Sequence, residues 1–329
     1  MAKTLGAISA ARDSEAAGPA AVQNPLRIST ESRSHKTLYM PSRLATAETA
    51  DTAIKVVAVP TPDCTLSGLP GTTLLMNEST GAVRALVNSA ELTGLRTAAA
   101  SALATRTLAQ PDSRSLVIFG SGVQAYFHAR LILELFPSLE HVDFIVRSRN
   151  ERTSSLCAKL SQRFDSVTVQ VREAGEVDDV LPRADIVCTC VPSTSPLFDV
   201  GMLKGTVHIN AIGSYTPRMF EFPPELVSEA EAACIPQILV DSRSACLAEA
   251  GELIAARVAP ERTTELGELF DPVSGRLRED EKATKAMADL RRAGKSLFKC
   301  VGIGGMDVAI TRLVVDVAEK QGTGSIVAY

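Results

Sequence analysis

A glycine pattern after an apolar run is the first stretch of the chain that could do chemistry. Gly120-Ser121-Gly122-Val123-Gln124-Ala125 follows the run 116–119, and it has the G-x-G-x-x-A form that binds dinucleotides. The first glycine allows a tight turn, the second lets backbone approach a pyrophosphate, and the small third residue keeps the next helix close to the strand. That helix, expected over about 124–136, would offer unpaired N–H groups to phosphates. The alternative is a plain strand-to-helix turn.

The residues after the next apolar run, 142–146, bear on which dinucleotide binds. NAD sites usually carry Asp or Glu about 20 residues after the glycines, whereas this chain has Arg147-Ser148-Arg149. Guanidinium groups offer paired donors to phosphate oxygens, so the triplet suits the 2′-phosphate of NADPH. NADPH is therefore favoured over NADH, and the alternative is that 147–152 is a solvated basic loop.

Two loops with Ser, Thr and Pro extend the candidate cofactor site. They cover 191–196 and 212–217, each directly after an apolar run. Because open α/β sheets bind ligands beyond the carboxyl ends of their strands, we expect both loops to face a ligand. The further candidate cofactor contacts in and around these loops and near the chain end are Thr189, Val191, Gly213 and Gly302.

The elements that must position these residues alternate between strands and helices, which is the pattern of a doubly wound parallel sheet. The candidate strands are 116–119, 142–146, 168–171, 186–189, 208–211 and 238–240.

Ahead of this region, extended structure is expected over 26–28 and up to Met40-Pro41, and a strand over 54–59. Hairpin partners are expected at 72–77 and 82–87, and an Ala-rich helix over 95–109. A final amphipathic helix, about 307–319, is expected to return to this first part of the chain. The expected fold class is therefore α/β, with a second α+β domain built from both chain ends.

Composition bounds the class of protein. A chain of 329 residues can bury a large core in two domains. A net charge of −4 and the absence of Trp give neither a basic field nor stacking platforms for nucleic acid. No apolar stretch is long enough for a membrane span. Seven scattered Cys without a C-x-x-C pair suit reduced thiols, hence the cytoplasm. The four His are unclustered, so no metal site is expected.

The order of motifs resembles the ornithine cyclodeaminase/μ-crystallin family from about Arg27 to the C-terminus. The resembling stretches are Leu95-Arg-Thr-Ala-Ala-Ala, Phe119-Gly-Ser-Gly-Val-Gln-Ala-Tyr, His208-Ile-Asn-Ala-Ile-Gly-Ser-Tyr-Thr-Pro, Val240-Asp-Ser, Glu265-Leu-Gly-Glu-Leu, and Leu297-Phe-Lys-Cys-Val-Gly followed by Asp307. The resemblance implies a Rossmann domain (110–301) and a substrate-binding and dimerisation domain (25–109 plus 302–329). It also implies a homodimer that carries out NAD(P)-linked chemistry on amino or imino acids. The start of the chain (1–24), rich in Ala, Ser and Gly, is expected to be a loose N-terminal arm, where family members have a longer helical segment.

By this resemblance, Arg27, Lys55 and Arg96 fall where the family grips the substrate carboxylate. Arg engages a carboxylate bidentately, while Lys acts as a compact charge. An acid held in this way has its α-carbon fixed for hydride arrival. Surface charge is the alternative for each cation. It is weakest for Arg96, because Arg96 opens an Ala-rich apolar helix where an unpartnered cation would be costly.

Two departures from the family pattern bear on the reaction. Cyclodeaminases carry Asp directly after a Gly-Gly pair, where this chain has Gly213-Ser214-Tyr215. They also place an acidic residue just before a Met-Pro pair, where this chain has Leu38-Tyr39. The pattern is closer to the ketimine-reducing members, whose cyclic imine needs only a hydride and one proton. Tyr215, a held water or Lys55 could supply that proton, and the alternative for Tyr215 is a loop residue covering the sheet edge.

The sequence therefore predicts an NAD(P)H-dependent reductase of cyclic ketimine carboxylates, with products such as proline or pipecolate. An ornithine cyclodeaminase or an alanine-type amino-acid dehydrogenase is the alternative within enzymes. A non-catalytic NADPH-binding protein is the alternative outside them.

Overall fold

The chain forms two compact units in the computed structural model, which describes residues 1–12, 22–46, 49–61, 63–64, 68–229 and 235–327. Unit 1 is Met1–Arg96, Asp271–Gly275 and Ile303–Tyr329, and unit 2 is Thr97–Phe270 and Arg276–Gly302. The boundary between them falls inside helix α2 (Ala90–Leu108), whereas the sequence indicated a boundary after this helix. Both ends of the chain contribute to unit 1.

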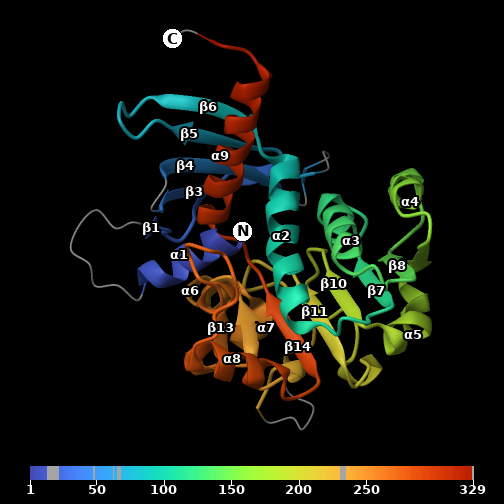
Figure 1. Ribbon diagram of the computed structural model, residues 1–329. Helices are drawn as coiled ribbons and strands as arrows, with labels where there is room; N and C mark the ends of the chain where they lie inside the picture. The colour runs from blue at the N-terminus through green and yellow to red at the C-terminus, as the bar shows by residue number, and fades with distance from the viewer. Residues whose placement is uncertain (13–21, 47–48, 62, 65–67, 230–234, 328–329) are drawn as a thin grey trace. The chain divides into compact units, whose positions relative to one another are not determined.

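Unit 1 contains an antiparallel sheet, which among the described residues has the order β1-β3-β4-β5-β6 (Figure 1). Strand β2 also pairs with β3. The strands are β1 (Val22–Gln23), β2 (Ile28–Glu31), β3 (His35–Ala45), β4 (Ala50–Pro60), β5 (Gly71–Met76) and β6 (Val83–Asn88). The predicted hairpin is confirmed, since β5 and β6 pair antiparallel.

The sequence placed a segment end at Met40-Pro41, but β3 continues through both residues. Proline has no backbone N–H, so it cannot donate a hydrogen bond to a neighbouring strand. Here β2 pairs with residues 36–39 of β3 and β1 with residues 43–44. Pro41 therefore lies at the break between these two partners.

Two helices complete unit 1. Helix α9 (Gly304–Gln321) packs on β3, β4 and β5, where Val308 and Val315 join a cluster with Leu75. It ends at Gly322, whose φ of +64° is the left-handed conformation of a helix C-cap. Helix α1 (Ala2–Arg12) occupies part of the expected loose arm and packs against α9 with Leu5 buried. This apolar contact gives the segment a reason to be helical; residues 13–21 of the arm lie outside the described residues.

Unit 2 contains a parallel sheet, eight-stranded over the described residues, in the order β13-β12-β14-β11-β10-β7-β8-β9. Its strands are β7 (Ser115–Phe119), β8 (His141–Val146), β9 (Thr168–Glu173), β10 (Ile186–Thr189), β11 (Val207–Ala211), β12 (Ile238–Val240), β13 (Thr263–Glu265) and β14 (Lys295–Lys299). The six predicted strands are present, and the parallel α/β class is confirmed. β13 and β14 were not predicted.

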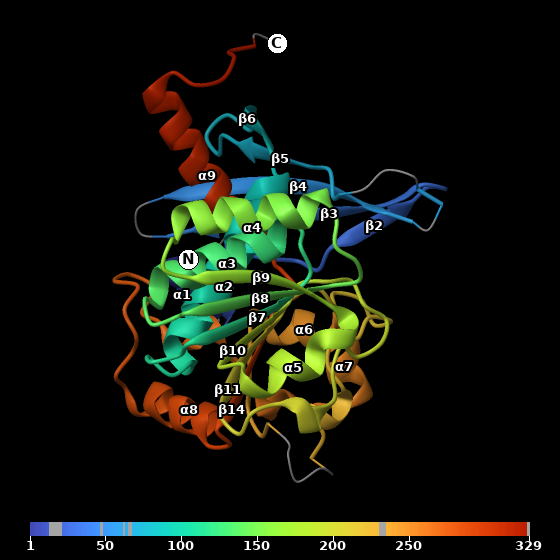
Figure 2. The same ribbon diagram turned by 90° about the vertical axis from the view of Figure 1, so that its right-hand side faces the viewer.

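Helices cover both faces of this sheet. Figure 2 shows α3 (Val123–Leu135) and α4 (Glu151–Arg163) on one side of β7, β8 and β9, and α5 (Val177–Val180) on the other. The further helices are α6 (Arg243–Glu249), α7 (Gly251–Ala255) and α8 (Glu281–Arg291), and the 3-10 helices are Ala174–Glu176, Leu181–Arg183, Val200–Met202, Pro224–Leu226, Pro260–Arg262 and Leu266–Leu269. Strands β7, β10 and β11 are buried throughout, as expected of a sheet covered on both faces.

Candidate functional site

The glycine turn of unit 2 forms the floor of a pocket with a volume of about 590 Å³ at the carboxyl ends of β7, β8 and β10. Gly120 has a φ of +108°, and a Cβ there would lie 2.8 Å from the Val191 side chain. Gly122 is the residue directly before α3, whose start is capped by no side chain, and a Cβ at Gly122 would meet nothing within 4 Å. An uncapped helix start beneath open space is the arrangement that binds phosphate groups.

The basic end of this pocket differs from the expected triplet. Arg147 and Ser148 line the pocket together with Arg152. Arg149 is not among the lining residues, and its Nη2 lies 3.2 Å from Glu176 Oε2. Arg152, the first arginine of the following helix, therefore replaces Arg149 in the candidate set for a 2′-phosphate.

The other candidate cofactor residues divide into two groups. Ser121 and Val191 line the pocket together with the glycines. The candidates outside the lining are Val123, Gln124, Thr189, Gly213 and Gly302.

Three of these outer candidates lie at or shortly after the carboxyl ends of strands of the parallel sheet. Thr189 is the buried last residue of β10. The Gly213 N–H donates to Glu221 over 2.6 Å, and the Gly302 N–H donates to Asp241 over 2.7 Å.

Unit 1 holds a buried cluster of two cations and one carboxylate. Lys55 projects from β4 and Arg96 from α2, and both contact Asp307 in the first turn of α9. Lys55 Nζ and Arg96 Nε each lie 3.2 Å from the same oxygen, Asp307 Oδ1. Within the described part of the chain, Arg96 Nη1 and Asp307 Oδ2 are buried without a hydrogen-bond partner. Two positive charges and one negative charge leave this cluster a net charge of +1.

Burial decides the protonation of Lys55, whose side chain is 2% exposed. Desolvation lowers the pKa of Lys55 to about 8, although the Asp307 carboxylate works in the opposite direction. Arg96 and, more weakly, Arg27 add to the lowering through charge repulsion. Arg27 is half-buried just before β2, and its charge is close enough to Lys55 to lower the pKa of Lys55. The structure thus brings Lys55 and Arg96 together and places Arg27 within electrostatic reach.

The counter-ion Asp307 was not assigned a role from the sequence. The sequence feature that could have identified Asp307 is its position, a lone carboxylate directly after Gly304-Gly305-Met306 in a segment that is otherwise apolar. A buried arginine and a buried lysine need such a partner. Gly304 lets the start of α9 pack closely against β3, because a Cβ at Gly304 would clash with Ser42 Oγ.

No group of three or more His, Cys, Asp or Glu side chains among the described residues could hold a metal ion. None of the described helices has the length and apolarity to cross a membrane.

Comparison with known proteins connects this geometry to a family. The model of the ornithine cyclodeaminase/mu-crystallin family matches residues 1–322. The chain belongs to this family. It is 31% identical over 255 residues to ketimine reductase mu-crystallin of Macropus fuliginosus, covering 78% of this chain and 71% of that protein. It is 28% identical over 264 residues to a Delta(1)-pyrroline-2-carboxylate reductase of Bacillus cereus, covering 79% and 74% respectively.

Among solved structures, the fold is similar to that of Thermococcus litoralis Delta(1)-pyrroline-2-carboxylate reductase in complex with NADH and L-proline. The TM-score is 0.79 at 24% identity, over 99% of this chain and 93% of that chain. The archaeal alanine dehydrogenase dimer with bound NAD gives a TM-score of 0.77 at 21% identity, over 100% and 92%. At these identities the comparison establishes the fold, a Rossmann-type α/β fold with a parallel sheet.

Tyr215 lies in unit 2, in the position where cyclodeaminases of this family are expected to carry Asp. It is half-buried in the segment after β11, directly beside the fully buried Ser214. The Ser214 N–H donates to Glu221, so the backbone on one side of Tyr215 is held in place. The structure thus places a phenol rather than a carboxylate at this position.

Proposed function

We propose that this member of the ornithine cyclodeaminase/mu-crystallin family is an NAD(P)H-dependent reductase of cyclic ketimine carboxylates. The observation that carries the proposal is the buried Lys55–Arg96–Asp307 cluster in unit 1, with its net charge of +1. The names of the relatives, ketimine reductase and Delta(1)-pyrroline-2-carboxylate reductase, support the same substrate class.

The unpartnered atoms of the cluster fit an imino acid. Buried polar atoms rarely lack hydrogen-bond partners, so Arg96 Nη1 and Asp307 Oδ2 are the atoms of the cluster with which a ligand would form hydrogen bonds. A protonated cyclic imine with a carboxylate on the imine carbon carries an anionic oxygen and an N–H close together. Arg96 and Lys55 would hold the oxygen, and Asp307 Oδ2 would accept the N–H. These contacts would fix the position of the imine carbon relative to the hydride donor, and such orientation lowers the barrier to reaction.

The glycine turn of unit 2 fits a dinucleotide. Its uncapped helix start and the open space over Gly122 suit a pyrophosphate. Bound NAD(P)H would supply the hydride that reduces the imine carbon. For the proton on nitrogen we propose Lys55, which would protonate the neutral imine as it binds and so create the N–H that Asp307 accepts before the hydride is transferred. A pKa of about 8 keeps Lys55 an acid that can transfer its proton near neutral pH.

We propose NADPH as the preferred cofactor. Arg147, Ser148 and Arg152 line one end of the pocket, and the described pocket lining contains no Asp or Glu that would bind a ribose 2′-hydroxyl. Two guanidinium groups around a hydroxyl suit a 2′-phosphate.

The family resemblance adds a homodimer to the proposal, and the scattered positions of the cysteines, which form no C-x-x-C pair in the sequence, support the cytoplasm as its compartment. Light scattering on purified protein tests the dimer through its mass.

The test of the proposed reaction follows NADPH absorbance with pyrroline-2-carboxylate and piperideine-2-carboxylate as substrates. We expect turnover of at least one of them, and Arg96→Met should abolish it while leaving NADPH binding unchanged. Ammonia release from ornithine, or NAD⁺ reduction with alanine, would instead indicate the alternative enzymes. NADPH binding without turnover of any imino acid would indicate a binding protein.

A further inference from the structure

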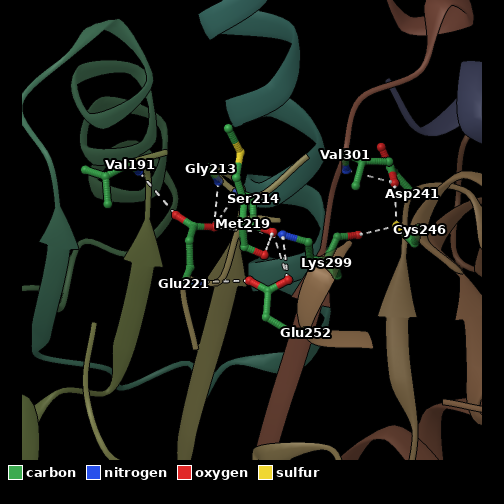
Figure 3. Close-up of polar contacts among 10 residues, drawn as sticks. All are labelled: Val191, Gly213, Ser214, Met219, Glu221, Asp241, Cys246, Glu252, Lys299 and Val301. Carbon is green, nitrogen blue, oxygen red and sulfur yellow. Dashed lines mark hydrogen bonds and ion pairs between the residues drawn. The ribbon is translucent and has the colours of Figure 1, made fainter. Parts of the chain in front are cut away.

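A second buried charge cluster lies in unit 2, at the carboxyl ends of β10, β11 and β14 (Figure 3). Glu221, Glu252 and Lys299 point toward one another, and all three side chains are fully buried. They come from the segment after the β11 loop, from α7 and from the end of β14. None of them belongs to the pocket lining, and the proposed reaction does not use them.

The Glu221 carboxylate accepts hydrogen bonds from three backbone N–H groups. Its Oε2 accepts the N–H groups of Gly213 and Ser214 over 2.6 and 2.9 Å, and its Oε1 accepts the Val191 N–H over 3.2 Å. The approach is so close that a Cβ at Gly213 would lie 2.5 Å from Glu221 Oε1. One carboxylate therefore ties the loop after β10 to the loop after β11.

Glu252 and Lys299 hold that carboxylate in place. Glu252 accepts the Glu221 backbone N–H over 2.7 Å and the Ser214 hydroxyl over 2.8 Å. Lys299 Nζ lies 3.8 Å from Glu221 and 4.0 Å from Glu252, and it has no hydrogen-bond partner among the described residues. The ammonium group thus acts on both carboxylates as a charge rather than as a donor.

The loop that Glu221 holds is a wall of the dinucleotide pocket. Val191, Ser193 and Leu197 all line the pocket. The Leu197 N–H donates to the Glu221 carbonyl over 3.1 Å, and the Phe220 N–H donates to the Ser193 carbonyl over 2.8 Å. Glu221 therefore fixes this wall at both ends, at Val191 through its side chain and at Leu197 through its backbone.

We propose that Glu221 is a positioning residue for the dinucleotide, holding the 191–197 wall of the pocket in its binding conformation only while it is an ionised carboxylate opposite Lys299. This inference rests on the dinucleotide site of the proposed function. Protonation turns one acceptor oxygen into a donor that faces backbone N–H groups, so the wall is released when Glu221 takes up a proton.

The surroundings put this protonation in the physiological range. Burial raises the pKa of Glu221 to about 7, against the lowering effect of Lys299 and of the backbone donors. The charged and titratable groups that act on Glu221 are Lys299 on β14, Glu252 on α7, and Cys188 and Cys190 at the end of β10.

The experiment measures the Kd of NADH, by the fluorescence of its dihydronicotinamide, between pH 5.5 and 9. NADH is used because the 2′-phosphate of NADPH titrates near pH 6 itself. If the protein with protonated Glu221 does not bind NADH, a Glu221 pKa of about 7 makes the Kd of NADH about tenfold higher at pH 6 than at pH 8.5. Glu221→Gln should bind NADH at least tenfold more weakly at pH 8.5, with a flat pH profile. Lys299→Met should move the midpoint to higher pH. Exposed Glu225, changed to Gln, is the matched control and should behave as wild type.

A flat wild-type profile, or a wild-type Kd and pH profile in Glu221→Gln, would overturn the positioning role while leaving the proposed function intact. If Glu221→Gln does not fold, the wild-type and Lys299→Met profiles decide. A wild-type protein that binds neither NADH nor NADPH would overturn the dinucleotide site itself and this role with it.

Discussion

Removing the charge of Asp307 is the sharpest perturbation that the cluster in unit 1 offers. Asp307→Asn keeps the shape of the side chain but leaves Lys55 and Arg96 buried without a counter-ion. Breaking a buried ion pair from one side costs about 3–5 kcal/mol, because the remaining charge stays desolvated. The lower end is expected at pH 9, since Lys55, with a pKa of about 8, is then largely neutral.

The assay is urea unfolding followed by far-UV circular dichroism, because the chain contains no Trp for fluorescence. Asp316→Asn is the matched control on the same helix. Asp316 lies 2.7 Å from Arg84 Nη2, but its side chain is 36% exposed. A partly exposed pair contributes about 0–1 kcal/mol, so this variant should lose far less stability.

A double variant refines the test. Combining Asp307→Asn with Lys55→Met removes one of the two stranded cations, so the loss in the double variant should be smaller than the sum of the single losses by more than about 1 kcal/mol. If Asp307→Asn lost no more stability than Asp316→Asn, the buried cluster could not be the charge system described above.

Three further predictions concern the dinucleotide pocket of unit 2 and the Lys55–Arg96–Asp307 cluster of unit 1. Gly122→Ala should leave the free energy of unfolding within about 0.5 kcal/mol of wild type, because a Cβ there meets nothing, yet weaken NADPH at least tenfold in a binding titration; unchanged affinity would remove the pyrophosphate from the glycine turn. Arg147→Ala should weaken NADPH more than NADH, whereas Arg149→Ala, already paired with Glu176, should change their ratio little; equal losses of both cofactors in Arg147→Ala would contradict the cofactor preference. Lys55 is charged below its pKa of about 8 and neutral above it, so pyrrole-2-carboxylate should bind more weakly as pH rises through 8, and Lys55→Met should abolish this dependence; a decline that persists in the variant would exclude Lys55 as its source.

Six of the eight described strands of unit 2 could be predicted from the sequence, because most of them are short apolar runs with turn residues on both sides. β13 could not, because its three residues are Thr263, Thr264 and Glu265. β14 could not, because it begins and ends with Lys295 and Lys299 and so has the composition of a surface segment. Lys299 is buried only because Glu221 and Glu252, distant in sequence, converge on it. A pattern read along the chain contains no information on such a convergence.

The candidate site shows the same limit. The glycine turn is a local motif, so Gly120 and Gly122 could be assigned with a physical reason for each. Arg152 was missed, because the direction in which successive arginines point depends on the start of α4 and on the partner of Arg149. The charge of Asp307 could be seen in the sequence, but its role depends on two cations that other elements bring to it.

The most direct test of the central claim is to follow the hydride itself. Purified protein is incubated with pyrroline-2-carboxylate and NADPH that carries deuterium at nicotinamide C4, and the amino acid product is analysed by mass spectrometry and NMR. We expect proline with one deuterium on the α-carbon from one of the two C4-labelled epimers of NADPH and none from the other. Proline without deuterium from either epimer, or deuterium at another carbon, would contradict this claim.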